Sequence, residues 1–398
     1  MTASGIPRRS PWRPTRWRLA VFIVTALGIL TWLARPYLSS AALLMDMTGA
    51  SPGVRRWLPV RVGPVDSHDL SVPTRHGAIP ARLYRSPDAT GPAIVIFPGV
   101  HGGGVDEPRL VALSRRIAAT GATVLSTPLP DLRRYRVTTR ATDMIEDATN
   151  WMAANPEFAP AGRVGVVGVS FAGGLALVAA GRPSLAGKLT AVFALGAHAD
   201  LPRVIRYLCM SDDAPKTVAA PHDYGVALML RASVALVVPA DQAAALDHAI
   251  VTFLDASSAE STDRTLSAKL FADARAAELA LPEPARTLMH GVNERDVRAL
   301  GKVLAPFAEE IGGAPALSPA RSPATTAPVF LLHGLDDNVI PSDESVAIER
   351  DLRAAGHTRV DTLLTPLLSH ADARTSAGAG EMWRLIRFWT RMTGSFER

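Results

Sequence analysis

The chain has 398 residues, which allows one large α/β domain with an insertion or two modest domains. Hydrophobic residues make up 48% and charged residues 20%, as in ordinary globular proteins, so the composition argues against a disordered chain. The formal net charge of +5 comes from five arginines in residues 1–18, because the rest of the chain holds 37 basic and 37 acidic residues. A body without net charge argues against nucleic-acid binding.

The only cysteine, Cys209, excludes an intramolecular disulfide bond. It lies in the apolar stretch 201–210 and lacks the cysteine partners of a metal site, so we expect a buried structural thiol. Nothing in the sequence implies a metal ion or an organic cofactor.

Residues 1–18 form a basic arm, and residues 19–38 follow as a transmembrane anchor or a signal segment. Residues 19–34 carry no charge, although this run is short for a hydrocarbon core of about 30 Å. Arg35 and Pro36 follow at once and argue against signal cleavage, so we expect an uncleaved single-pass membrane anchor rather than a buried soluble helix. The arginine arm predicts a cytoplasmic amino terminus and an extracytoplasmic body, whereas cleavage would give a secreted protein.

From residue 66 onward, short β-like runs alternate with helical ones. Buried apolar runs predict strands at 69–72, 79–84, 93–97, 123–126, 163–167, 190–195, 329–332 and 360–364. This alternation predicts an α/β fold with a mostly parallel sheet and helices on both faces. The predicted core comprises residues 66–198 and 326–395.

Residues 199–325 interrupt the alternation, and we expect them to form an inserted α-helical cap and a linker. Helical periodicity extends over 203–210, 224–237, 242–255, 265–280 and 297–311, and the Pro-rich stretch 315–328 leads back to the sheet. Parallel sheets of this kind bind ligands at the carboxyl ends of their strands, so the cap is expected over that edge.

Residues 168–174 (Gly-Val-Ser-Phe-Ala-Gly-Gly) follow a buried strand and open a helix. This motif resembles the nucleophile elbow of the α/β-hydrolase family, in which a serine sits on a tight turn between small residues. Ala172 stands where that family usually has glycine, and alanine is the next smallest residue. The resemblance implies that Ser170 is the nucleophile and that the N–H of Phe171 is one oxyanion-hole donor.

The glycine form of the same short pattern occurs around Ser51. The residue after it is Pro52, which has no N–H to donate to an oxyanion, and no strand precedes it. We therefore interpret Ser51 as a turn residue.

The resemblance also implies the other two members of a catalytic triad. The family carries its acid in a loop like residues 331–341, and matching spacing implies Asp337, with the adjacent Asp336 as an alternative. The order serine, acid, histidine leaves His357 and His370 as bases. His357 precedes the last predicted strand and so lies at the wrong sheet edge, which leaves His370.

The family takes a second oxyanion donor from the loop after the third strand, here residues 97–104. If Pro98 and Gly99 take the place of the family's usual His-Gly pair, the donor is the N–H of Val100. Otherwise it is the N–H of Gly102 or Gly103.

The resemblance therefore implies a serine hydrolase with an acyl-enzyme intermediate. We expect its substrate to be a small carboxylic ester with an apolar acyl group, because the predicted cap is apolar and the body has no net charge. An α/β-hydrolase-fold peptidase or thioesterase is the neighbouring alternative. A membrane-tethered binding protein whose catalysis has lapsed is an alternative from another class, because a fold does not guarantee activity.

Overall fold

The computed structural model describes residues 14–47, 64–210, 220–260, 262–368 and 378–397, in two units that divide after Val60. In the first unit, α1 (Pro14–Met47) is one helix with Pro36 inside it. Among the helices that the structure describes, none is long and apolar enough to cross a membrane. The anchor predicted over residues 19–38 is therefore not supported, and the extracytoplasmic placement stays a prediction. The charge-free run is bounded by arginines on both sides, and a bilayer requires about 20 apolar residues.

The second unit is built around an eight-stranded sheet with the order β1-β2-β4-β3-β5-β6-β7-β8. Its strands are β1 (Asp66–Val72), β2 (Ile79–Arg85), β3 (Ala93–Phe97), β4 (Thr123–Ser126), β5 (Val164–Val169), β6 (Leu189–Leu195), β7 (Val329–Gly334) and β8 (Val360–Thr365). β2 pairs antiparallel with both β1 and β4, whereas all the other neighbouring strands pair in parallel. The mostly parallel α/β sheet predicted from the sequence is confirmed.

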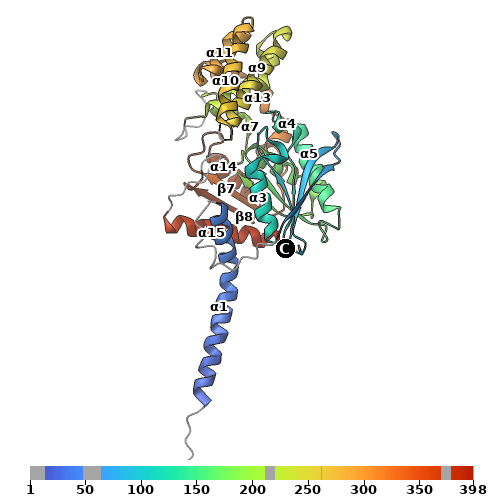
Figure 1. The fold of residues 1–398 in the computed structure, drawn as a ribbon, viewed down its shortest axis with the longest axis vertical. Helices are drawn as coiled ribbons and strands as arrows, with labels where there is room; N and C mark the ends of the chain where they lie inside the picture. Colours follow the sequence, from blue (N-terminus) through green and yellow to red (C-terminus); the bar gives the residue numbers. More distant parts are fainter. Residues whose placement is uncertain (1–13, 48–63, 211–219, 261, 369–377, 398) are drawn as a thin grey trace, which may run out of the picture. The chain divides into compact units, whose positions relative to one another are not determined.

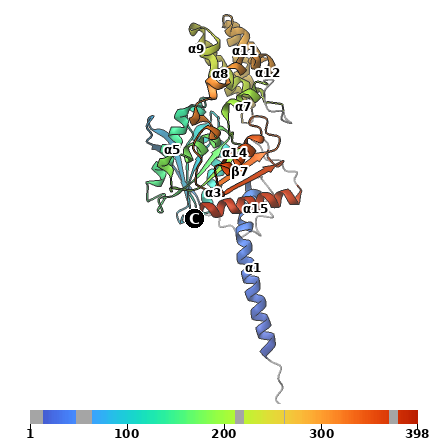
Figure 2. The ribbon, with the colours of Figure 1, turned by 180° about the vertical axis from the view of Figure 1, so that it is seen from behind.

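Helices cover both faces of this sheet (Figures 1 and 2). Phe193 of β6 packs against Trp389 of α15 (Ala379–Phe396), with ring centroids 5.7 Å apart. The next residue, Ala194, faces Gly173 of α6 (Phe171–Ala180). Because successive side chains of a strand point to opposite faces, α15 and α6 cover opposite faces. Outside the segment between β6 and β7, the other α-helices described in this unit are α3 (Pro108–Ala119), α4 (Pro130–Arg133), α5 (Thr139–Ala153) and α14 (Asp343–Ala354).

Between β6 and β7, the described residues form helices and turns without a strand. The helices are α7 (Leu201–Leu208), α8 (Asp223–Val237), α9 (Ala240–Ala259), α10 (Arg264–Ala280), α11 (Ala285–Asn293), α12 (Val297–Leu304) and α13 (Ala308–Gly312). Helices α8, α10 and α11 each pack against α9. We call this segment, from α7 to α13, the helical insertion.

Two elements of the helical insertion differ from the sequence-based expectation. The helix predicted over residues 297–311 is divided into α12 and α13 by a 3-10 turn at Ala305–Phe307, which contains Pro306. A proline lacks the N–H that a continuous helix needs, so the break has a local cause. Helix α11 was not among the predicted helices, and it begins directly after Pro284, which takes its N-cap position.

The single cysteine lies at the carboxyl end of α7. Cys209 is buried, and burial raises the pKa of its thiol to about 12. A thiol that stays protonated at neutral pH is a poor nucleophile and a poor metal ligand. The expected buried structural thiol is confirmed.

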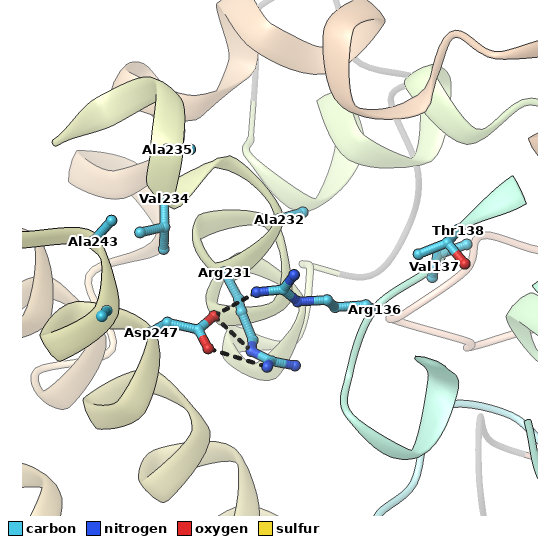
Figure 3. A pocket seen from close by; sticks show the side chains of 10 residues that line it. Arg136, Val137, Thr138, Arg231, Ala232, Val234, Ala235, Ala243 and Asp247 are labelled. Atoms are coloured by element: carbon cyan, nitrogen blue, oxygen red, sulfur yellow. Dashed lines mark hydrogen bonds and ion pairs between the residues drawn. The ribbon is translucent and has the colours of Figure 1, made fainter. Parts of the chain in front are cut away.

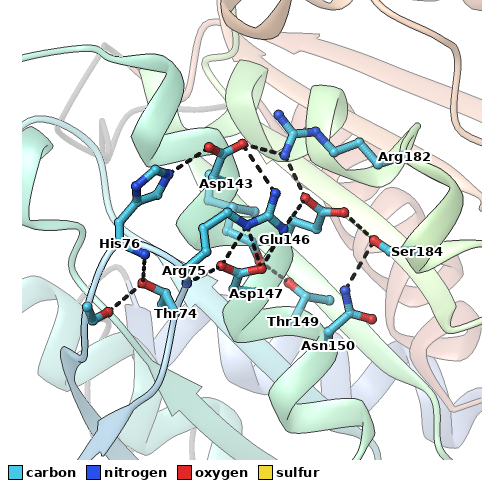
Figure 4. A network of polar contacts seen from close by, with 12 residues as sticks. Thr74, Arg75, His76, Asp143, Glu146, Asp147, Thr149, Asn150, Arg182 and Ser184 are labelled. Carbon is cyan, nitrogen blue, oxygen red and sulfur yellow. Dashed lines mark hydrogen bonds and ion pairs between the residues drawn. The ribbon is translucent and has the colours of Figure 1, made fainter.

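A polar network fastens the turn between β1 and β2 to α5 (Figure 4). Arg75 in that turn donates from Nη2 to Asp147 Oδ1 at 2.6 Å and to Glu146 Oε2 at 2.7 Å. Arg182 donates from Nη1 to Asp143 Oδ1 and to Glu146 Oε2, both at 2.6 Å. Three carboxylates on one helix thus share two guanidinium groups from distant segments. We interpret the network as structural, because it holds the turn between β1 and β2 against α5.

This network predicts a loss of stability at acid pH. Burial alone would raise the pKa of Glu146, but hydrogen bonds from Ser184 and Arg182 outweigh burial and hold that pKa below its usual range. The same balance, with donors from His76 and Arg182, lowers the pKa of Asp143. A carboxyl group with a lowered folded-state pKa contributes stability above its unfolded-state pKa, which is about 4. That contribution is lost as the pH falls through the folded-state value.

Urea unfolding at a series of pH values tests this expectation. For the wild-type chain, the free energy of unfolding should decline as the pH falls from about 5 to about 3, and Glu146→Gln should make the decline shallower. Glu157→Gln, which changes a more exposed carboxylate just after the same helix, should leave the decline unchanged. Equal declines in wild type and Glu146→Gln would show that the network does not hold the pKa of Glu146 down.

Candidate active site

Ser170 occupies the one-residue turn between β5 and α6. Its backbone has φ 58° and ψ −133°, a conformation that residues other than glycine rarely adopt. Its N–H donates to the carbonyl oxygen of Leu195 at 2.7 Å, and its own carbonyl oxygen accepts from the N–H of Gly173 at 2.8 Å. Such strain persists only where the surroundings fix the backbone, and it concentrates at functional sites.

The turn is tight enough to require small residues on both sides of Ser170. A Cβ at Gly168 would lie 2.7 Å from the carbonyl oxygen of Ala172 and 2.7 Å from the Cα of Gly173. Ala172 itself is completely buried. The pattern seen in the sequence therefore has a steric cause at this position.

Phe171 begins α6, and its side chain is buried against His198, with ring centroids 5.6 Å apart. What Phe171 can offer a substrate is its backbone, because the first N–H groups of a helix have no partner within the helix. The positive end of the helix dipole lies at the same place. Both features favour negative charge beside Ser170.

His198 packs against the start of α6, next to this turn. It is fully buried, and a Cβ at Gly174 would come within 2.3 Å of its Cε1 atom. Its Nε2 lies 2.7 Å from the carbonyl oxygen of Leu317. Burial lowers the pKa of His198, which keeps the imidazole neutral. We interpret it as a packing residue that the sequence gave no reason to single out.

The loop after β3 lies directly against Ser170. A Cβ at Gly99 would be 2.9 Å from the Cβ of Ser170 and 3.1 Å from the carbonyl oxygen of Val169. Val100 is the next residue of this loop. Of the alternative donors, the N–H of Gly103 already donates to His101 Nδ1 at 2.9 Å. This favours Val100 over Gly103.

Asp337 lies in the loop after β7 and is 4% exposed, whereas the adjacent Asp336 is exposed. Its Oδ1 accepts from the N–H groups of Val339 and Ile340, both at 2.9 Å. Its Oδ2 faces Gly196, where an added Cβ would be 3.4 Å away. One carboxylate oxygen is therefore held by the backbone, and the other lies beside the end of β6.

A buried histidine shapes the same loop. His333 Nδ1 lies 2.7 Å from Ser345 Oγ, and its Nε2 lies 2.8 Å from the carbonyl oxygen of Ile340. Nε2 is also 3.4 Å from Asp337 Oδ2. Because both ring nitrogens are engaged, His333 acts on the loop and on Asp337 rather than as a free base.

The predicted base, His370, lies outside the described residues. The described chain runs from the carboxyl end of β8 to Leu368, two residues before it. The rejected candidate His357 precedes β8, and its Nε2 lies 2.8 Å from the carbonyl oxygen of Ala327. Ser170, Phe171, Val100 and Asp337 are thus gathered at the carboxyl ends of β5, β3 and β7, and His370 stays a prediction.

The helical insertion contacts the loop after β3 through two tyrosines. The hydroxyl of Tyr135, which follows α4, lies 2.7 Å from Asp255 Oδ1 of α9. A Cβ at Gly102 would lie 3.1 Å from the same hydroxyl. Tyr224 of α8 donates to the carbonyl oxygen of Val100 at 3.5 Å. The two hydrogen bonds join residues more than a hundred positions apart, so no local sequence pattern could have shown them.

Glu344 of α14 anchors the segment that follows β6. It is 2% exposed, and its Oε2 accepts from the N–H groups of Ala199 at 2.8 Å and Asp200 at 3.0 Å. Arg203 of α7 donates to the same oxygen at 2.9 Å. The buried carboxylate of Glu344 thereby links α14 to the segment that follows β6 and to α7, the first helix of the helical insertion.

We expect Glu344→Gln to lower the free energy of unfolding by about 3 kcal/mol, because it leaves Arg203 without its charge partner and sets an amide against backbone N–H groups. Glu349→Gln, on the same helix, breaks a more exposed pair with Arg353 and should cost less than about 0.5 kcal/mol. Urea unfolding at neutral pH measures both values. A loss at Glu344 no larger than the loss at Glu349 would rule out this anchoring role.

The described residues contain no group of three or more histidines, cysteines or acidic residues that could hold a metal ion. No model of a protein family matches the sequence, and no curated protein does. Solved structures resemble the chain. An esterase from Pyrobaculum calidifontis is 18% identical with a TM-score of 0.44, and the match covers 97% of this chain and 98% of the esterase.

An acylaminoacyl peptidase from Pyrococcus horikoshii is 12% identical with a TM-score of 0.44, and the match covers 85% of this chain and 42% of the peptidase. The chain has the α/β-hydrolase fold. Its sheet is mostly parallel in the strand order given above, and Ser170 lies on the turn after β5.

Proposed function

We propose that this chain is a serine hydrolase that cleaves carboxylic esters through Ser170, His370 and Asp337. The observation that carries the proposal is the strained backbone of Ser170, with φ 58° and ψ −133°, at the start of a buried helix. A turn that costs energy and places a hydroxyl beside helix N–H groups suits a nucleophile better than a structural residue.

In this mechanism His370 removes the proton of Ser170 as the serine oxygen attacks the acyl carbon. Asp337 holds the imidazole in the correct tautomer and stabilises the imidazolium. The N–H groups of Phe171 and Val100 donate to the oxyanion. His370 then protonates the leaving alkoxide, and water activated by His370 releases the acid from the acyl-enzyme.

We propose an apolar acyl group because of what lies around Ser170. Val100 and Tyr224 are partly buried and pack against the hydrophobic core, and the hydroxyl of Tyr224 donates to the carbonyl oxygen of Val100 at 3.5 Å. The rest of the chain has no excess of basic residues that would attract an acidic substrate. These features favour a small ester with an apolar acid.

A fluorophosphonate probe, which reacts with activated serines, tests the nucleophile. The wild-type chain should be labelled, Ser170→Ala should not be labelled, and His370→Ala should react at least about 10²-fold more slowly. Ser51→Ala is the matched control, because Ser51 has the same short sequence pattern and should be dispensable. Labelling that survives Ser170→Ala, or is lost in Ser51→Ala, would overturn the assignment.

A panel of p-nitrophenyl esters, thioesters and peptide amides of the same acyl group tests the substrate class. We expect turnover to be highest on the esters. Turnover that is restricted to amides or thioesters would contradict the proposed ester specificity. It would leave the assignment of Ser170 as the nucleophile unchanged.

A further inference from the structure

The first turn of α8 is hydrogen-bonded to two loops of the candidate active site. The N–H of His222, the N-cap residue of α8, donates to the carbonyl oxygen of Asn338 at 2.8 Å. Asn338 directly follows Asp337 in the loop after β7. The hydroxyl of Tyr224 donates to the carbonyl oxygen of Val100, in the loop after β3, at 3.5 Å. Two residues of this turn thus contact the loop of the proposed acid and the loop of the proposed oxyanion donor.

The strand order places this connection across the candidate site. In the sheet, β5 and β6 lie between β3 and β7, and these four strands are parallel, so their carboxyl ends share one edge. A link between the loop after β7 and the loop after β3 therefore crosses the carboxyl ends of β5 and β6. Ser170 lies at the carboxyl end of β5. The start of α8 is thus placed where it can hold the two loops at a fixed spacing on either side of the proposed nucleophile.

Charged contacts hold α8 in place along its length. At its start, Asp223 forms an ion pair with Arg295, which lies between α11 and α12. Two turns further along, Arg231 donates from Nε to Asp247 Oδ1 of α9 at 3.0 Å. Figure 3 shows that Arg136, from the segment joining α4 to α5, reaches the same carboxylate, with Nη2 donating to Oδ1 at 3.0 Å. The first turn of α8 therefore projects from a helix that is tied to its neighbours.

The ring of Tyr224 is itself fixed by its neighbours. It packs against the hydrophobic core and edge-on against the ring of Tyr135, with centroids 6.4 Å apart. Tyr135 has a backbone φ of 56°, which residues other than glycine rarely adopt, and its hydroxyl lies 2.7 Å from Asp255 Oδ1. Burial raises the pKa of Tyr224 well above its usual value, so its hydroxyl keeps its proton at neutral pH. A fixed ring with a protonated hydroxyl can hold the carbonyl group of Val100 in one orientation.

We propose that Tyr224 is a positioning residue of the hydrolase, which holds the loop after β3 so that the N–H of Val100 points to the oxyanion. This inference rests on the proposed function and gives the helical insertion a part in assembling the active site. A residue in the wall of an acyl-binding site would select among acyl groups. Because Tyr224 acts through Val100, its loss should instead lower kcat by the same factor for short and long acyl groups.

Steady-state kinetics of Tyr224→Phe on p-nitrophenyl acetate and p-nitrophenyl octanoate test the proposal. The change removes one hydroxyl and keeps the ring, so kcat should fall about three- to tenfold on both esters, with KM changed by less than about twofold. Tyr84→Phe is the matched control and should keep the wild-type kcat. Tyr84 is also buried, and its hydroxyl has no hydrogen-bond partner among the described residues. A wild-type kcat in Tyr224→Phe, or a loss confined to KM or to one of the two esters, would overturn the proposal.

A double-mutant cycle with Gly99→Ala shows whether Tyr224 acts through the loop after β3. Gly99 precedes Val100, and a Cβ there would lie 2.9 Å from the Cβ of Ser170. If Gly99→Ala already displaces the N–H of Val100, adding Tyr224→Phe should lower kcat further by less than about twofold. Two losses that multiply would show that Tyr224 acts elsewhere, and the proposal would fail.

Labelling with the fluorophosphonate probe separates this inference from the proposed function. Expressing kcat per labelled serine removes the contribution of any unfolded protein, so a less stable variant does not imitate a misplaced loop. If Ser170→Ala abolishes labelling while Tyr224→Phe keeps the wild-type kcat, the positioning role fails and the hydrolase assignment stands. If labelling survives in Ser170→Ala, both fail.

Discussion

Asp337→Asn should lower kcat on an ester substrate by about 10³–10⁴-fold, whereas Asp336→Asn should change it by less than about twofold. Asp337 is buried, and one of its oxygens is held by the N–H groups of Val339 and Ile340. An asparagine of the same shape can keep that oxygen as an acceptor, but its NH₂ group then replaces the oxygen that would accept from the imidazole. The base would lose the partner that fixes its tautomer.

Steady-state kinetics on both variants distinguishes the two neighbouring carboxylates. Asp336 provides the matched control, because it is the same residue type one position away and is exposed. KM should change little in Asp337→Asn, since the residue does not contact the substrate in the proposed mechanism. A large loss of kcat in Asp336→Asn with an active Asp337→Asn would transfer the role of the acid to Asp336.

The elements of the sheet were predictable because their signal is local. The structure forms β3 and β4 over the predicted residues 93–97 and 123–126, since short apolar runs are buried on both faces of a parallel sheet. The turn at Ser170 was visible for the same reason, because its small neighbours are adjacent in sequence.

The supports of the candidate site were not predictable, because they are pairs of distant residues. Glu344 meets the N–H of Ala199, and Tyr135 meets Asp255, only after the chain has folded. Each of these residues has an ordinary surrounding sequence, and a lone glutamate is usually a surface residue. A local pattern can place a functional side chain on an element, but it does not show which distant group holds that element in position.

Gly99→Ala should lower kcat by about 10²–10³-fold with little change in KM, which is the loss typical of one oxyanion-hole donor. The added Cβ would lie 2.9 Å from the Cβ of Ser170 and 3.1 Å from the carbonyl oxygen of Val169. Ser170 is fixed by hydrogen bonds on both sides of its backbone, so the loop after β3 has to move instead. That movement displaces the N–H of Val100 from the oxyanion.

Gly394→Ala is the matched control, because its Cβ would meet nothing within 4 Å and alanine is favoured within α15. It should retain full activity and at least the stability of wild type. Thermal unfolding separates a displaced donor from a damaged fold, since overpacking at Gly99 should cost only about 1–3 kcal/mol. If Gly99→Ala kept its kcat, the loop after β3 would have no part in stabilising the oxyanion. The second donor would then have to come from another segment near Ser170, and the strained turn alone would support the assignment of the nucleophile.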